Sequence, residues 1–146
     1  MKADIKTKKD NTKKVMADLR ELTGKVVVVG VVDPKVAAYA TYNEFGTESI
    51  PQRSFLRSTY DENIAKWQGY FQKALARVLA GSMQASVVLP RIGLDAQAAV
   101  RRKIASNIQP ANAPATIKKK GGGKTTLYDT GTLTRAITYE VRNESV

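Results

Sequence analysis

Lys25-Val-Val-Val-Val-Gly-Val-Val-Asp33 is the stretch that decides the fold. Its β-branched side chains favour a strand, and the run is far shorter than the roughly 20 residues that span a bilayer. The Asp33-Pro34 pair that follows is a turn signal. Because the run shows no polar alternation, we expect a buried strand rather than a half-exposed edge.

A second strand is expected near the other end of the chain. Ala136-Ile-Thr-Tyr-Glu-Val-Arg142 alternates apolar and polar residues, which places Ile137, Tyr139 and Val141 on one face. This alternation is typical of a half-buried strand. We therefore expect a small antiparallel sheet in which the first and last strands pair.

Helical patterns fill the space between the two strands. Apolar periodicity predicts an N-terminal helix over residues 10–23, a short helix over 36–45 and a long helix over 59–82. Thr59-Tyr-Asp-Glu62 has the spacing of a capping box for the long helix. A further pattern covers residues 84–106, where Pro90 either kinks one helix or separates two. The chain thus predicts a single α+β domain, residues 1–146, with the sheet packed against three to four helices.

Residues 109–126 are expected to form a flexible basic arm. Two prolines, three consecutive glycines and four lysines give this segment few apolar groups to bury. Gly121-Gly-Gly-Lys-Thr125 resembles part of a phosphate-binding loop, but Lys118 stands where the first glycine of that motif belongs. A flexible segment is therefore preferred to a nucleotide site.

The composition lacks several of the side chains that enzymes most often use for catalysis. The chain has 146 residues, 42% of them hydrophobic, and it contains no cysteine and no histidine. Thiol nucleophiles, Cys or His metal sites and the commonest general acid–base residue are therefore excluded. No paired carboxylates stand out. We therefore expect neither an enzyme nor a cofactor. The first residues show no secretory signal, so we expect a soluble protein that is made in the cytoplasm and has no membrane partner.

The net charge of the chain gives information about its partners. Lysines and arginines total 24 against 13 acids, a net charge of +11. The span from Arg91 to Lys124 holds eight bases and one acid, a local net of +7. Such a balance indicates an acidic partner, either nucleic acid or a negative protein surface. Arg101, Arg102 and Lys103 are the candidate contacts, although a solvated lysine-rich surface gives the same composition.

Two separated motifs resemble one protein family. Ala38-Tyr39-Ala40 leads into Glu44-Phe45-Gly46-Thr47, and then follows Ile50-Pro51-x-Arg53-x-Phe55-Leu56-Arg57. Further along come Ile104, Pro110, Thr116-Ile117 and Lys120, then Leu127-x-Asp129-Thr130-Gly131-x-Leu133, and finally Ile137-Thr138. In this order, over roughly residues 25 to 142, the chain resembles the tail-completion, or virion morphogenesis, proteins of tailed bacteriophages. Ser54 and Gln52 depart from the family pattern, which often has proline and a small residue there.

The resemblance implies a structural virion protein of the head–tail neck that completes the tail and joins it to the DNA-filled head. It implies a homo-oligomeric ring, expected to be a hexamer, between the head connector or stopper and the tail terminator or tail tube. Packaged DNA is a further, non-specific contact. We expect the loop and the arm to supply the subunit and partner contacts: Phe45, Gly46, Ile50, Pro51, Arg53, Phe55, Arg57, Lys118, Lys119, Lys120 and Lys124.

Two alternatives stay open at this point. A tail terminator or a head–tail stopper has the same building plan and differs in its neighbours. A non-specific basic DNA-binding protein belongs to another class of function. The net charge of +7 between Arg91 and Lys124 supports this alternative. Ring stoichiometry, tail type and the residues that face the DNA channel do not follow from the sequence.

Overall fold

In the part of the chain that the structure describes, the sheet has two strands, which lie far apart in the sequence. The computed structural model describes residues 11–127 and 129–144. Strand β1 (Lys25–Val31) pairs antiparallel with β2 (Ile137–Asn143), in a register that runs from Lys25 opposite Asn143 to Val31 opposite Ile137. The expected pairing of the first and last strands is confirmed. Along β2 burial alternates as the sequence predicts.

β1 is less covered than its sequence predicts. Within the described residues it pairs with β2 alone, so its other edge is unpaired. Val28 is 37% exposed and Val32, just beyond the strand, is 71% exposed. The expectation of a buried strand is therefore wrong for this single chain. The reason is that an apolar run reports what a strand can bury and does not supply the element that covers it.

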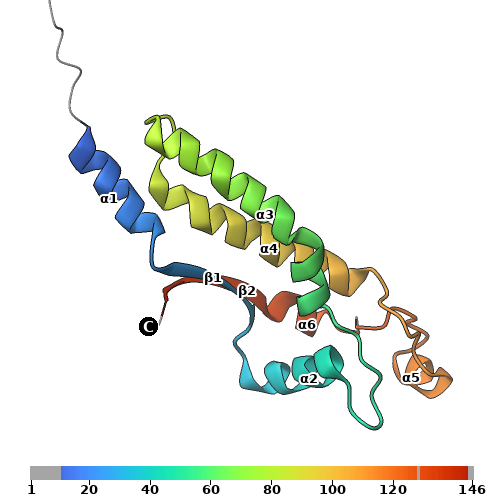
Figure 1. Cartoon of the computed structure of the whole chain (residues 1–146). Helices are drawn as coiled ribbons and strands as arrows, with labels where there is room; N and C mark the ends of the chain where they lie inside the picture. Colours follow the sequence, from blue (N-terminus) through green and yellow to red (C-terminus); the bar gives the residue numbers. More distant parts are fainter. Residues whose placement is uncertain (1–10, 128, 145–146) are drawn as a thin grey trace, which may run out of the picture.

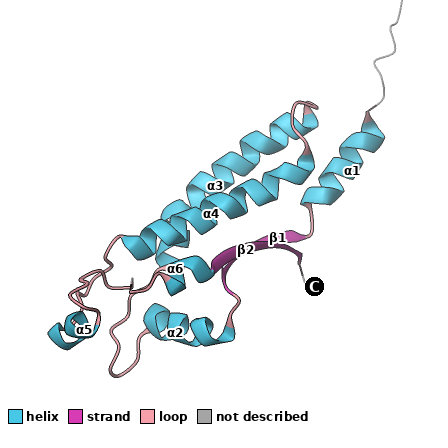
Figure 2. Ribbon diagram, turned by 180° about the vertical axis from the view of Figure 1, so that it is seen from behind, coloured by secondary structure: helices cyan, strands magenta, loops and turns pink. Residues whose placement is uncertain are grey.

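Helices make up most of the remaining described chain (Figures 1 and 2). They are α1 (Thr12–Leu22), α2 (Pro34–Phe45), α3 (Leu56–Leu79), the 3₁₀ turn η1 (Ala85–Val87), α4 (Val88–Ala105), α5 (Pro114–Lys119) and α6 (Thr132–Ala136). The α+β class is confirmed. The N-terminal helix was expected from residue 10, which lies outside the described residues.

α4 is the central element, because it packs on both strands and on α3. Pro90 lies in the first turn of α4, where a missing amide hydrogen is tolerated. The 3₁₀ turn η1 precedes α4 directly, so the predicted helical segment is interrupted before Pro90 and not at it. Gly93 lets the helix approach β2 closely: a Cβ atom there would lie 2.1 Å from the ring of Tyr139.

Two apolar clusters hold the layers together. One lies at the α2 end of the sheet and centres on Phe55, Ile104 and Ile137, all fully buried. The other lies where α1 meets α3 and α4, around Leu22, Val78 and Val88. Figure 1 shows α3 and α4 side by side over the strands, with α2 on the other side of the strands. The junction between α2 and α3 is therefore part of the main core.

α3 begins three residues before the predicted capping box. Its first residue is Leu56, and Thr59 lies inside the helix, where its Oγ1 donates a hydrogen bond to the carbonyl of Phe55. The predicted cap is therefore wrong. The residue at the cap position is Phe55, and its apolar side chain cannot accept hydrogen bonds from the first backbone amides of α3. That role falls to an acid on another helix, Glu44 of α2.

Candidate subunit interface

Glu44, near the end of α2, caps the start of α3 from a distance in sequence. Its carboxylate accepts hydrogen bonds from the backbone amides of Phe55 at 2.8 Å, Leu56 at 2.8 Å and Arg57 at 3.0 Å. The hydroxyl of Ser54 donates a fourth bond at 2.6 Å. These are the orphan amides that every helix N-terminus presents, and the positive end of the helix dipole favours the same charge. One side chain thus joins the two helices.

The Glu44 side chain is 4% exposed, yet its carboxyl group favours the ionised form. Burial alone would raise the pKa of Glu44, but the hydrogen bonds from Ser54 and from the amides of Leu56, Arg57 and Phe55 outweigh it, so the pKa lies below its ordinary value. The Arg57 guanidinium adds an ion pair, with Nε 3.5 Å from the carboxylate. This charge therefore stabilises the fold above the ordinary carboxyl range of pH.

The loop between α2 and α3 is closed by its own backbone. Gly46 adopts φ +78°, and a Cβ there would lie 3.0 Å from the amide nitrogen of Gln52. The amide of Thr47 donates to the carbonyl of Ile50, and the amide of Arg53 donates to the carbonyl of Asn43. Only glycine adopts the positive φ of position 46 without strain. The loop is thereby a rigid turn on the end of α2.

Arg53 fastens the second half of the chain to this loop. The side chain is buried, at 6% exposure, and it donates from Nε to the carbonyl of Pro110 at 2.8 Å and from a terminal nitrogen to the carbonyl of Ala111 at 3.2 Å. Its planar fork matches two adjacent carbonyls, which a lysine could not bridge in the same way. The loop and the arm are therefore one structural unit.

The arm of residues 109–126 is folded, which the sequence did not predict. It contains α5 and turns back at Gly121 and Gly122, both with positive φ. Asn112 donates to the carbonyls of Lys124 and Thr125, and Lys120 donates to those of Thr125 and Thr126. These bonds tie the base of the arm together. A six-residue helix gives too little periodicity to be read from a lysine-rich sequence.

Two of the predicted contact residues lie inside the subunit. Phe55 is 0% exposed and belongs to the core, and Arg53 serves the arm. Their assignment as partner contacts is corrected by their burial. Phe45, in contrast, is 62% exposed, and the Arg57 guanidinium lies 5.3 Å from the centre of its ring. Pro51 is exposed and Ile50 half-buried beside it.

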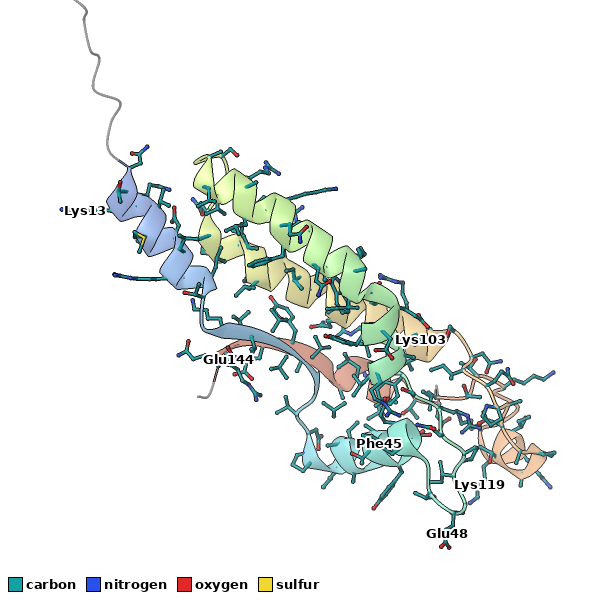
Figure 3. All side chains as sticks on the ribbon, in the orientation of Figure 1. Lys13, Phe45, Glu48, Lys103, Lys119 and Glu144 are labelled. Carbon is teal, nitrogen blue, oxygen red and sulfur yellow. The ribbon has the colours of Figure 1, made fainter. Side chains whose placement is uncertain are left out.

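The predicted basic cluster is divided by the structure. Arg101 donates to the carbonyl of Ile137, and Lys103 pairs with Glu62, which leaves Arg102 exposed between them. On the arm, Lys118, Lys119 and Lys124 are exposed, whereas Lys120 is half-buried on carbonyl oxygens. In Figure 3 Lys119 lies at the same end of the molecule as Phe45 and Glu48, and Lys103 lies at the α4 end closer to α3.

The structure exposes two apolar surfaces, of which the sequence indicated the first through Phe45 and missed the second. Tyr39, Tyr42 and Phe45 lie exposed along α2, and we call these three residues the aromatic stripe. The second surface is an open groove of about 630 Å³ between β1, α3 and α4, whose lining includes Val29, Trp67 and other apolar residues. The spacing of three residues between successive stripe rings was a readable signal. The groove was not readable, since it is made by three separate elements.

No candidate metal site lies on either surface within the described part of the chain. Among the described residues no group of three or more Asp, Glu, His or Cys side chains is placed to bind a metal ion. Asp95 accepts hydrogen bonds from Lys66 Nζ and from Trp67 Nε1, the ring nitrogen of a residue that lines the groove. None of the described helices combines the length and the apolar character that a membrane crossing requires.

No family model, no curated protein and no solved structure matches this chain.

Proposed function

We propose that this chain is a structural virion protein of the head–tail neck, a tail-completion subunit that acts in a ring. The observation that carries the proposal is that the residues of the phage-like motif work together. Glu44 caps α3, Gly46 closes the turn, and Arg53 holds the arm. A motif whose members build one rigid end of a subunit suits an assembly protein, whose function is the surface that it presents.

The outward side of this unit suits a binding role. Phe45 and Arg57 are exposed there, and aromatic residues and arginine are favoured at the centres of protein interfaces. Lys118, Lys119 and Lys124 on the arm add positive charge. A net charge of +11 suits a position next to packaged DNA or to an acidic connector surface.

The experiment is complementation of a phage that lacks this chain. Loss of a tail-completion protein should leave DNA-filled heads and finished tails of normal length that do not join, and purified chain added to that extract should restore joining. Overlong tails would instead indicate a terminator, because the tube would not stop growing. Heads that lose their DNA would indicate a stopper. Normal virion yields without the chain would contradict all three structural roles.

The second candidate, a non-specific DNA-binding protein, is favoured only by the charge. Arg102, Lys118, Lys119 and Lys124 are exposed cations. If these four neutralise phosphates, affinity for bare duplex should fall by about a hundredfold between 50 and 200 mM salt. A steep decrease of that kind, together with normal assembly without the chain, would favour this candidate over the neck protein.

A further inference from the structure

A pocket of about 500 Å³ lies where α2, the arm and α6 meet. Tyr39 lines it from α2, Thr116 and Lys120 line it from the arm, and Leu133 lines it from α6. Tyr39 belongs to the first of the two sequence motifs, and the other three residues belong to the second. Residues far apart in the sequence thus form one concave surface, which we call the arm pocket.

The lining of the arm pocket carries a net positive charge. Its charged residues are three lysines, Lys35, Lys119 and Lys120, and one acid, Asp129, which leaves a net of +2. Lys35 and Lys119 are exposed, and within the described part of the chain neither forms an ion pair. Asp33 lies close to Lys35 in the sequence, but its carboxylate accepts the amide hydrogen of Lys35 and caps α2. Two lysine charges at the rim can therefore pair with an incoming anion.

Lys120 adds a partly desolvated charge to the pocket wall. Its Nζ donates to the carbonyls of Thr125 and Thr126 at 3.0 and 3.1 Å, and both of these acceptors are neutral. Burial lowers the pKa of Lys120, Asp129 raises it in part, and Arg53 lowers it further. A second negative charge beside this ammonium group would oppose the effect of burial. The pocket therefore favours an anion at this place.

Hydroxyl groups and apolar side chains complete the lining of the arm pocket. The Oγ1 atoms of Thr130 and Thr132 share one hydrogen bond of 2.6 Å, so one of their two hydrogens remains for another acceptor. Val36 is half-buried, and Leu127 and Leu133 are buried. The arm pocket thus places cations and a hydrogen-bond donor beside an aliphatic wall.

We propose that the arm pocket binds an acidic segment of a partner protein, in which carboxylates flank an apolar side chain. The carboxylates pair with the lysines and accept from the threonine hydroxyl, and such charge-assisted hydrogen bonds are the stronger kind. The apolar side chain covers the aliphatic wall. This inference rests on the proposed function, because the segment would belong to a neighbour of the neck ring. A single pocket binds weakly, and a ring of copies gains from binding several segments at once.

The aliphatic wall favours a protein segment over nucleic acid. A duplex presents phosphates and sugars to the outside, and these gain little from contact with Val36 or the leucines. A single strand gains most from stacking on aromatic side chains, and Tyr39 is the one ring among the described lining residues. A peptide, in contrast, supplies both the negative charge and the apolar group. Nucleic acid is therefore the alternative that the experiment must distinguish.

The probe is a five-residue peptide with blocked ends, which has leucine at its centre and two glutamates on each side. In an NMR titration of the isotope-labelled chain at low salt, it should bind with a dissociation constant below about 1 mM. The backbone amide signals that shift should be those of residues 35–39, 116–120 and 129–133. Absence of binding, or shifts confined to other residues, would overturn the proposal.

Changes to the probe test both parts of the proposed segment. Replacing its four glutamates by glutamines removes the charge and should weaken binding by about tenfold or more. Replacing its leucine by serine removes the apolar group and should also weaken binding by about tenfold. A glutamine peptide that binds equally well would overturn the electrostatic basis of the site. A serine peptide that binds equally well would overturn the role of the aliphatic wall.

Changes to the chain locate the contact. The double substitution Lys35→Gln/Lys119→Gln alters two exposed rim residues and should weaken binding of the glutamate peptide by about tenfold. Lys118→Gln/Lys124→Gln is the matched control, because it removes the same charge from exposed arm positions outside the pocket lining. It should change the dissociation constant by less than about twofold. An equal loss in both variants would show attraction by net charge alone and overturn the proposal.

A single-stranded oligonucleotide of five thymidines is the second probe. We expect it to bind more weakly than the glutamate peptide. Tighter binding of the oligonucleotide, lost in the same Lys35→Gln/Lys119→Gln variant, would show that the pocket takes nucleic acid and overturn the proposal. The site and the neck function also fail separately. A chain that restores head–tail joining but does not bind the glutamate peptide refutes the site alone. A chain that binds the peptide as expected but is dispensable for joining refutes the neck function alone.

Discussion

Replacing Glu44 by glutamine tests the structural account at its most connected side chain. The carboxylate accepts four hydrogen bonds, three from backbone amides and one from Ser54. Glutamine keeps one oxygen, which can still accept from the amides of Phe55 and Leu56. Its amide nitrogen then faces Ser54 and Arg57. The Ser54 hydroxyl can reverse and accept, but the Arg57 amide loses its partner.

The magnitude follows from these bonds. Losing a hydrogen bond to a charged group costs about 1.5–3 kcal/mol, and reducing two others from charged to neutral strength costs about 1 kcal/mol together or slightly more. We therefore expect Glu44→Gln to lower the free energy of unfolding by about 3 kcal/mol at pH 7. With a urea dependence of about 1.5 kcal/mol per molar, the midpoint should fall by about 2 M.

The effect should depend on pH with a definite sign. The pKa of Glu44 is depressed in the folded state, so its contribution is fully present above the pKa of the unfolded chain, about 4.3. The contribution is lost as the pH falls below that value towards the folded pKa. The difference in stability between the wild type and Glu44→Gln should therefore shrink by about 1.4 kcal/mol per pH unit in that window.

Urea unfolding at pH 7 and pH 3.5, followed by far-UV circular dichroism and by fluorescence of the single tryptophan, is the assay. Glu48→Gln is the matched control, because it makes the same chemical change at an exposed position of the neighbouring loop. It should change stability by less than about 0.5 kcal/mol. A Glu44→Gln protein within that margin of the wild type at pH 7 would refute the capping role.

Three further predictions concern the backbone and the arm. Gly93→Ala should destabilise by more than about 2 kcal/mol in thermal unfolding, because a Cβ meets the Tyr139 ring. Gly69→Ala in α3 has no atom within 4 Å and should stabilise by about 1 kcal/mol, and equal effects would refute the close-approach argument. Gly46→Ala should cost about 2 kcal/mol in the same measurement, since φ is +78° there, and an unchanged midpoint would contradict the strain. Arg53→Met should make trypsin cleave within residues 118–124 about thirtyfold faster, because the arm loses two charge-assisted bonds worth about 2 kcal/mol. An unchanged cleavage rate would show that the arm is held elsewhere.

The two strands and their pairing were predictable from local pattern. Alternation along β2 and the valine run of β1 are strong signals, and two predicted strands in one domain are most simply paired with each other. The exposure of β1 was not predictable, since a sequence shows which side chains are apolar but not how many elements the fold supplies to cover them. The aromatic stripe of α2 shows the same limit for a helix.

The start of α3 was missed for a different reason. Thr59 and Glu62 fit a local cap, yet the amides of the first turn are satisfied by Glu44, which lies twelve residues before Leu56. A bond of that kind depends on how two helices meet. Arg53 and Phe55 were likewise assigned to an interface because they belong to the loop motif, and the tertiary fold places both inside the subunit. The sequence located the loop between two helices and misjudged which of its side chains face outward.

Quantitative mass spectrometry of purified virions tests the proposed neck function most directly. Peptides of this chain would be counted against the major tail protein of the same particles. The account predicts about one ring of subunits per virion, a handful to a dozen copies, retained after purification at high salt. Absence of this chain from virions would contradict the neck function, and so would a copy number that rises with the amount of packaged DNA.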